Sequence, residues 1–277
     1  VMGVDFDPLS LNPEERKDYS YEGPEIIYTF WAKHGPCQVT GCGHRTPIMT
    51  SPVMAVKTPT AKSWDHVCAA CGTSFDIEDG EARMAPDVPL FVAPGEKPYS
   101  ILDPKGRVTC PSCGHASMVK LGKGKNKKVE LSLLVHPEWL AGSPKKDDAG
   151  FEYGGTATDS LASTSRWNID RAKRLRLLEV RGALPETVTC PETNVTFATD
   201  KEGGTVPRKS TFTCQADGRE NDVLEAIKAS GKTGPMAGYA IQGFSPRRKD
   251  IGAPYNGRFF MPFGEAIANQ YNAAISE

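Results

Sequence analysis

The chain has 277 residues and a formal net charge of −1, from 33 basic and 34 acidic residues. This balance gives no overall attraction to nucleic acid or to an acidic membrane surface, so any such attraction depends on local patches. The 8 cysteines are too few for a small disulfide scaffold, no secretory signal peptide opens the chain, and no apolar stretch approaches the ~20 residues of a membrane span. We therefore expect a cytoplasmic protein without membrane contact, and because its first residue is valine, we expect a piece of a longer protein.

The first third of the chain predicts short strands. Residues 1–24 are polar and turn-rich, whereas residues 25–32 are rich in β-branched and aromatic side chains, as strands are. A second strand is predicted at 47–56, broken at Pro52, and residues 73–78 alternate polar and apolar side chains like a half-buried strand. With 22 prolines and 27 glycines, the composition favours short elements joined by many turns, so we expect a strand-rich α+β chain.

A basic hairpin is predicted next. Its arms are residues 116–121 and 129–135, and its tip is made of glycines, lysines and an asparagine. Five lysines fall within nine residues, with no acidic residue among them. These lysines are Lys120, Lys123, Lys125, Lys127 and Lys128.

A linker and a basic helix follow the hairpin. Residues 142–158 are rich in turn-forming residues and predict a linker. A helix is predicted at 161–173, capped by Asp159 or Ser160, and residues 175–180 are interpreted as a strand. The helical segment carries basic side chains that include Arg166, Arg171 and Arg174.

The last part of the chain predicts a second small unit. Cys190 and Cys214 each follow a short β-branched strand, as Cys110 does. Short helices are predicted at 222–230 and 264–276. The predicted division is an N-terminal segment at 1–24, a ribbon domain with the basic hairpin at 25–141, a linker and basic helix at 142–184, and a ribbon-like domain at 185–277.

Three short cysteine motifs dominate the chemistry of the sequence. Each has two cysteines separated by two or four residues, with a glycine directly after the second cysteine. Two thiolates on such a turn form half of a tetrahedral zinc site, and a second turn completes it. Disulfides and a redox motif are alternatives, but paired cysteines in a reducing compartment favour a metal, and no motif has a thioredoxin-like setting. The predicted zinc ligands are Cys37, Cys42, Cys68, Cys71, Cys110 and Cys113.

The spacing does not fix which motifs share an ion. The first motif can pair with the third or with the second, and the motif left over then needs two more ligands. Histidines within three residues of a motif are candidates, namely His34, His44, His66 and His115. A site with four protein ligands is structural rather than catalytic, since catalytic zinc keeps one position open.

The first motif lies in a segment that resembles a known family. A YTFWA strand at 28–32 enters the C-x4-C-G motif, and a Pro-Ile pair leaves it. Further matching segments lie at 171–182, 212–214, 230–235 and 255–260. Together they resemble the zinc-ribbon segment of the large adenine-specific DNA methylases that are often encoded beside anti-phage defence genes.

The resemblance implies a zinc ribbon followed by a second ribbon-like unit, within an S-adenosylmethionine-dependent methyltransferase. Such enzymes need a glycine-rich cofactor loop and an Asp/Asn-Pro-Pro-Tyr/Phe loop that grips the flipped adenine. Neither loop occurs in this sequence. The chain is therefore expected not to be catalytic by itself, and S-adenosylmethionine is expected only in the full-length protein.

The second unit departs from the family pattern. The family has Cys-x2-Cys where Cys214 is followed by Gln-Ala-Asp, and another such motif after the position of Phe244. Three of these four ligands are replaced, so the second ribbon is expected to be degenerate and to bind no zinc. Cys190 and Cys214 are then expected to be free thiols, or alternatively to complete the motif left over in the first unit.

These features predict a zinc-stabilised auxiliary domain of a DNA methyltransferase in anti-phage defence. The hairpin lysines and the helical arginines are its predicted DNA contacts. The alternative is a protein-interaction scaffold that docks the methylase onto other defence proteins. A stand-alone enzyme has no support, because neither a nucleophile–base motif nor a phosphate-binding loop occurs.

Overall fold

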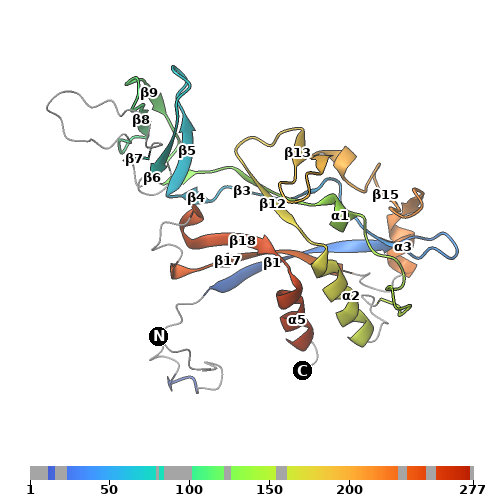
Figure 1. Cartoon of the computed structure of the whole chain (residues 1–277). Helices are drawn as coiled ribbons and strands as arrows, with labels where there is room; N and C mark the ends of the chain where they lie inside the picture. Colours follow the sequence, from blue (N-terminus) through green and yellow to red (C-terminus); the bar gives the residue numbers. More distant parts are fainter. Residues whose placement is uncertain are drawn as a thin grey trace.

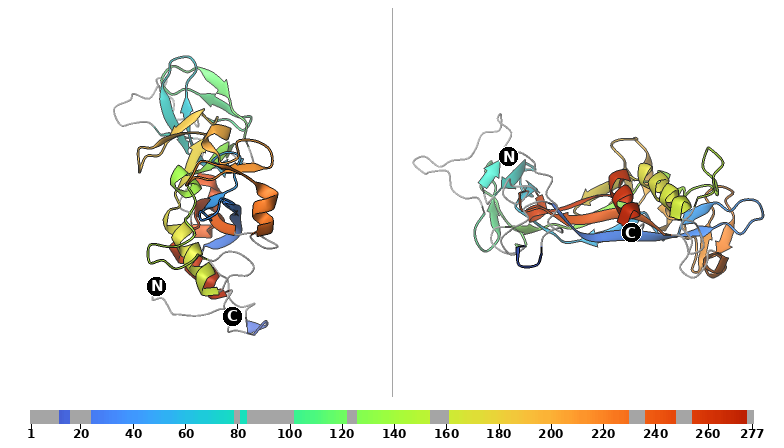
Figure 2. Two further views of the ribbon diagram at one scale, coloured as in Figure 1. Left: turned by 90° about the vertical axis from the view of Figure 1, so that its right-hand side faces the viewer. Right: turned by 90° about the horizontal axis from the view of Figure 1, so that it is seen from below.

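The computed structural model describes residues 12–15, 24–78, 81–83, 102–121, 126–153, 161–229, 236–247 and 254–274. In these residues the protein is strand-rich with few helices, so the predicted α+β class is confirmed. The molecule is elongated, with small strand units placed along a central sheet (Figure 1, Figure 2). No helix in the described ranges is long and apolar enough to cross a membrane.

The central sheet is antiparallel and joins segments from near the two ends of the chain. β1 (Glu25–Pro36) pairs with β17 (Met236–Phe244), with Glu25 opposite Phe244 at one end of the pairing and Lys33 opposite Met236 at the other. Two helices, α2 (Leu161–Lys173) and α5 (Glu265–Ala274), pack against each other on one side of this sheet (Figure 1). The spatial order of the strands is β18 (Arg258–Pro262), β17 (Met236–Phe244), β1 (Glu25–Pro36) and β2 (Arg45–Pro47).

The largest apolar cluster lies between this sheet and the helices. It includes Trp139 of the short helix α1 (Pro137–Leu140), Trp167 of α2, and Tyr239 and Ile241 of β17. Large aromatic side chains bury more apolar area than most other side chains, so their burial contributes strongly to the stability of a domain.

A second antiparallel sheet has β11 (Leu131–Val135) at its centre. Every residue of β11 is buried, because apolar clusters cover both faces of the strand. Leu131 and Leu133 pack against Tyr255 on one face, and Leu134 packs against Cys190 and Phe197 on the other. The spatial order is β12 (Leu177–Arg181), β11 (Leu131–Val135) and β3 (Val53–Lys57).

One end of the molecule is a ribbon of short hairpins (Figure 1, upper left). Its apolar cluster is small and contains Trp64, Phe75, Ile77, Leu102 and Val108. Two sheets make up the ribbon: β5 (Ser63–Val67), β6 (Ser74–Glu78) and β7 (Glu81–Arg83) in the first, and β8 (Arg107–Thr109) and β9 (Ala116–Met118) in the second. A two-residue pairing of β4 (Thr60–Ala61) with β10 (Lys127–Lys128) connects the ribbon to the rest of the chain.

The described ranges also contain two further hairpins and three short helical elements. The hairpins are β13 (Thr187–Thr189) with β14 (Thr196–Ala198), and β15 (Thr211–Thr213) with β16 (Glu220–Asp222). The helical elements are η3 (Lys201–Gly203), α3 (Val223–Ala229) and η4 (Pro254–Gly257).

The two arms of the predicted basic hairpin do not pair with each other, although an isolated antiparallel bridge joins Leu121 to Lys127. β9, which lies in its first arm, pairs with β8, and β11, which is its second arm, pairs with β3 and β12. The LSLLV sequence of β11 explains the difference, because a strand that is apolar on both faces needs the centre of a covered sheet. The predicted helices at 161–173, 222–230 and 264–276 and the strand near 175–180 correspond to α2, α3, α5 and β12.

The strand pairing also does not follow the predicted division at residue 185. β1 from the predicted ribbon domain and β17 and β18 from the predicted last domain form one continuous ladder. A strand pattern in the sequence does not indicate which distant strand will become its neighbour.

Candidate metal centres

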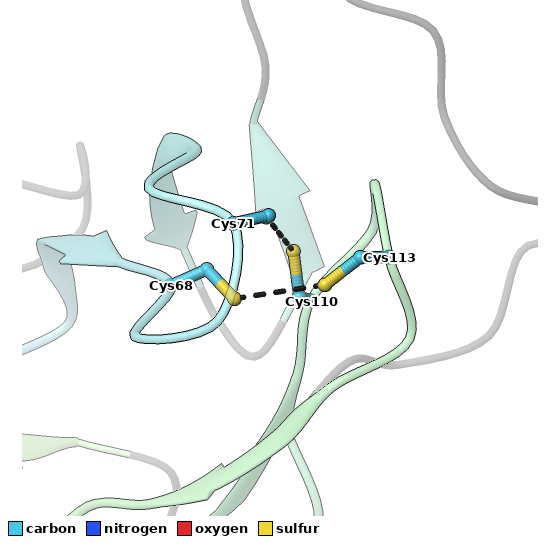
Figure 3. Close-up of side chains that lie close together, drawn as sticks. All are labelled: Cys68, Cys71, Cys110 and Cys113. Atoms are coloured by element: carbon cyan, nitrogen blue, oxygen red, sulfur yellow. Dashed lines mark hydrogen bonds between the residues drawn. The ribbon is translucent and has the colours of Figure 1, made fainter.

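The first centre contains four cysteines on two facing turns of the ribbon. Cys68 and Cys71 lie on the turn between β5 and β6, and Cys110 and Cys113 lie on the turn between β8 and β9. The Sγ atoms of Cys68 and Cys113 are 3.7 Å apart, as are those of Cys71 and Cys110 (Figure 3). The four side chains converge on one point from both turns.

The backbone of these turns explains their sequence. The Cys68 amide donates to the Thr73 carbonyl oxygen at 2.9 Å, and the Gly72 amide donates to the Cys68 carbonyl oxygen at 2.9 Å. The turn at Cys110 makes the same two bonds, with His115 and Gly114. The glycine after the second cysteine has a φ of 72° in one turn and 71° in the other, a region that glycine enters without steric cost.

The sulfur separations match a tetrahedral metal ion. Zinc–thiolate bonds are about 2.3 Å long, which sets the edges of a regular tetrahedron at about 3.8 Å. The two measured separations of 3.7 Å agree with that edge and are far longer than a disulfide bond of about 2.05 Å. All four cysteines are free. This group can therefore hold a metal ion with four sulfur ligands.

The observed pairing differs from both predicted alternatives. Each alternative gave the first motif a partner among the other two, whereas the structure joins the second motif to the third. The physical reason is the ribbon core, since Phe75 and Ile77 of one hairpin and Val108 of the other share one apolar cluster. The sequence did hold a signal: these two motifs have the same two-residue spacing, and the first has four.

The second centre joins segments that are 172 residues apart in the chain. Cys37 and Cys42 come from the loop between β1 and β2, and Cys214 and Asp217 come from the turn between β15 and β16. The Sγ atoms of Cys42 and Cys214 are 3.9 Å apart, and the Cys37 Sγ lies 3.4 Å from the Asp217 Oδ2. A zinc tetrahedron with one carboxylate oxygen has sulfur–oxygen edges of about 3.5 Å, so these separations also fit a metal ion.

Direct contacts dock this hairpin against the end of β1. The backbone amide of Gln38 donates to the Asn221 Oδ1 at 2.7 Å, and the backbone amide of Gln215 donates to the Thr46 Oγ1 at 3.2 Å. Phe212 is fully buried and lies so close to Gly35 that an added Cβ there would be 2.5 Å from its ring. Gly35 therefore permits the close approach that brings the two halves of the centre together.

The prediction that Cys214 is a free thiol outside the first unit is corrected. Its turn makes the same two backbone bonds as the other motifs, with Arg219 and Gly218, and Gly218 has a φ of 73°. Asp217 therefore occupies the place of the second cysteine in a preserved turn. The predicted alternative, that Cys190 and Cys214 complete the second or third motif, is confirmed only in that Cys214 joins a metal-binding group; the motif that it completes is the first, Cys190 is not included, and the carboxylate ligand was missed. The Cys-x2-Asp-Gly sequence was the signal for it.

Cys190 lies on a fourth turn with the same backbone hydrogen bonds, but this turn has neither a cysteine nor a carboxylate at the place of the second ligand. Its amide donates to the Val195 carbonyl oxygen, and the Asn194 amide donates to the Cys190 carbonyl oxygen. Asn194 has a φ of 57° where the other turns have glycine. Thr193 replaces the second cysteine, and its Oγ1 is 2.9 Å from the His136 Nε2. Cys190 belongs to no metal-binding group within the described part of the chain, and it packs in an apolar cluster instead.

The four histidines considered as ligands belong to neither group among the described residues. His34 is fully buried, with its ring against the edges of Trp139 and Trp167. His66 lies with its Nε2 3.0 Å from the Ser117 Oγ. These contacts agree with packing and hydrogen-bonding roles.

Hydrogen bonds lower the pKa of two ligand side chains, whereas burial raises the pKa of the Cys37 and Cys214 thiols. The hydroxyl and amide of Thr73 lower the pKa of Cys71 to about 6, and the Cys71 side chain is exposed. The backbone amide of Arg219 lowers the pKa of Asp217 below its ordinary value. A lowered pKa favours the deprotonated form, which is the form that binds a metal.

No family model, curated protein or solved structure matches the chain.

The predicted DNA contacts fall into two groups. Lys120 and Lys128 are exposed, Lys127 is half-buried, and Lys123 and Lys125 lie outside the described residues. Arg166 pairs with Asp147 at 3.4 Å, and Arg174 pairs with Asp170 at 2.9 Å. These helical arginines are already engaged within the protein.

The prediction that Arg171 contacts DNA at the surface is corrected, because Arg171 is a core residue. Its side chain is fully buried and donates to the backbone carbonyl oxygens of Gly142 and Trp139. These oxygens lie at the C-terminal end of α1, where a cation satisfies the unpaired carbonyl groups. The sequence places Arg171 on a basic helix but does not show that this face of the helix turns inward.

Proposed function

We propose that the protein is a zinc-stabilised, non-catalytic module that engages DNA, and that it serves as an auxiliary domain of an adenine-specific DNA methyltransferase. Support comes from the saturated donor sets of both centres and from the unpaired basic side chains beside the ribbon. The resemblance of the sequence motifs supplies the methyltransferase context.

Zinc is the metal that suits both donor sets best. Thiolates are soft ligands that favour zinc over magnesium, calcium or manganese, and zinc accepts a carboxylate oxygen as a fourth ligand. The sulfur separations of 3.7 Å in the first centre support this assignment. With four protein ligands on each ion, zinc would stabilise the fold and leave no open position for a substrate.

S-adenosylmethionine does not fit the residues of this chain. The sequence has neither a glycine-rich cofactor loop nor the loop that grips a flipped adenine. The cofactor would therefore be held by other parts of the methyltransferase, and no chemical step is assigned to this module.

The observation that carries the DNA proposal is the position of Lys127 and Lys128. They form β10, which pairs with β4 at the junction of the ribbon and the second sheet. Neither lysine forms an ion pair with a described residue, in contrast to Arg166 and Arg174. Unpaired cations on a rigid strand can displace counterions from DNA phosphates, which is the main source of protein–DNA affinity.

The test is a charge reversal of both lysines in the full chain. Lys127→Glu with Lys128→Glu should lower duplex DNA affinity at least about tenfold at low salt. The slope of the logarithm of affinity against the logarithm of salt should flatten by about 0.9 for each DNA phosphate that the variant no longer neutralises. Fluorescence anisotropy across a salt series measures both quantities.

A matched control is the same change at Lys145 and Lys146, which are exposed and adjacent in sequence. This variant should bind DNA with the salt slope of the unmodified protein. An unaltered slope in the Lys127/Lys128 variant, or no DNA binding by the unmodified protein, would contradict the proposal, and binding to a protein partner without DNA would favour a scaffold.

A further inference from the structure

A groove of about 290 Å³ lies between the ribbon and the second sheet. Ser63 and Trp64 of β5 contribute to one side, Lys127 and Lys128 of β10 to another, and Arg181 at the end of β12 to a third. The groove exists because β10 pairs with β4, while the Gly182 amide donates to the Glu130 carbonyl oxygen at 2.8 Å. It is therefore built from several separate strands.

Arg181 is held in a fixed orientation at this groove. Its Nε donates to the Tyr255 hydroxyl oxygen at 2.9 Å, and that hydroxyl donates to the Glu179 Oε2 at 3.1 Å. The guanidinium carbon lies 5.3 Å from the centre of the Tyr255 ring. No described residue accepts a hydrogen bond from the two terminal nitrogens of Arg181. A guanidinium positioned in this way presents a fork that matches two phosphate oxygens.

The turn that supplies Tyr255 has a backbone that side chains normally avoid. Tyr255 has a φ of 63° and Asn256 a φ of 49°, and Gly257 follows at 85°. Two successive non-glycine residues in the left-handed region are uncommon, and such strain gathers at functional sites. The turn stays in place because the Tyr255 ring packs against Leu131 and Leu133.

Two lysines and a buried indole among the lining residues lack polar partners in the described part of the chain. Trp64 is 4% exposed, and its Nε1 has no hydrogen-bond partner within the described residues. Lys127 and Lys128 have no ion pair there either. Two carboxylates, Asp65 and Glu130, line other parts of the groove. Cationic groups on one part and carboxylates on another favour a single anionic group over a long run of phosphates.

We propose that this groove binds one phosphate of a DNA strand, with Arg181 as its bidentate donor and Lys127 and Lys128 beside it. This inference rests on the proposed function and adds the place and the residue of contact. Tyr255 is a positioning residue, because its hydroxyl holds the Arg181 fork in place. Asp65 and Glu130 repel further phosphates and so limit the contact to one phosphate.

The test compares three variants of the full chain on a DNA duplex across a salt series. Arg181→Ala should lower affinity about tenfold at low salt and reduce the salt slope by about 0.9, the change expected when one phosphate is no longer neutralised. Arg181→Lys should keep the slope but bind more weakly, because a lysine keeps the charge without the fork. Tyr255→Phe should also keep the slope and lower affinity about threefold, since only the orientation of Arg181 changes.

Arg208→Ala is the matched control, because Arg208 is an exposed arginine paired with Glu220 at 2.7 Å. It should leave affinity and slope unchanged. Melting temperatures of all variants check that the fold is retained.

A second arm uses inorganic phosphate in isothermal titration calorimetry at constant ionic strength. No saturable binding in the low millimolar range supports a DNA phosphate, whereas saturable binding that Arg181→Ala removes would overturn it in favour of a free phosphate. If the unmodified protein binds DNA and Arg181→Ala keeps its salt slope, the groove assignment alone is contradicted. If the unmodified protein binds no DNA, the proposed function itself fails.

Discussion

Asp217 is the residue at which the two centres differ most. It stands where the two turns of the first centre have their second cysteine, and it brings a hard oxygen donor to a group of three cysteines. The side chain is exposed, whereas Cys37 and Cys214 are buried. Because soft thiolates bind zinc more strongly than an exposed carboxylate, the second centre should release its ion more readily than the first.

Replacing Asp217 tests this difference directly. Asp217→Cys should increase the zinc affinity of the second centre, and Asp217→Ala should reduce it by at least about tenfold, the scale seen even for outer-shell partners of a metal. Competition with a chromophoric chelator measures the affinity. Cobalt substitution gives a second readout, because the sulfur-to-cobalt charge-transfer band should grow with the fourth thiolate.

Asp148→Ala serves as the control, since Asp148 is an exposed aspartate outside both centres. Equal zinc affinity for Asp217→Ala and the unmodified protein would show that the carboxylate is not a ligand.

At the level of elements, four turns share one backbone pattern but only three take part in a metal centre. The turns at Cys68, Cys110 and Cys214 supply ligands, and the turn at Cys190 does not. The last turn is stabilised by an apolar cluster with Leu134 and Phe197. Packing and metal binding are thus alternative ways to stabilise the same short hairpin in this chain.

The ribbon hairpins should depend on their metal more than the central sheet does. Cys110→Ser removes a buried ligand from a unit whose apolar cluster is small. Because metal-binding free energy is folding free energy in such units, amide hydrogen exchange should accelerate in β5, β6, β8 and β9. Exchange in the ladder between β1 and β17 should stay slow.

Cys190→Ser is the matched control, because it changes a buried cysteine on the same kind of turn without a metal centre. It should leave the zinc content unchanged. Slow exchange throughout the ribbon of Cys110→Ser would mean that the metal is not needed for its fold.

The sequence predicted these elements unevenly, and the reason is physical. Local signals predicted the cysteine turns and α2, because glycine position, capping and periodicity act within a few residues. Non-local choices escaped prediction, such as the pairing of β1 with β17 and the contact of Cys42 with Cys214. Those choices depend on tertiary packing around residues such as Phe212 and Gly35.

At the scale of the whole molecule, the two centres belong to opposite ends of an elongated shape. The ribbon with the first centre lies at one end, and the β15 hairpin with the second centre lies at the other (Figure 1, Figure 2). Among the described residues, the buried apolar side chains form four separate clusters. An elongated protein buries less apolar surface per residue, so a metal ion bound at each end would supply stability that small cores lack.

If both groups bind a metal ion, each end of the molecule is held by one. The most direct measurement is the zinc content of the purified full chain by elemental analysis. The structure predicts two zinc ions per chain, falling to one in Cys110→Ser and to one in Cys214→Ser. A single zinc ion in the unmodified protein that persists in Cys214→Ser would contradict the second centre, and no zinc at all would contradict the account as a whole.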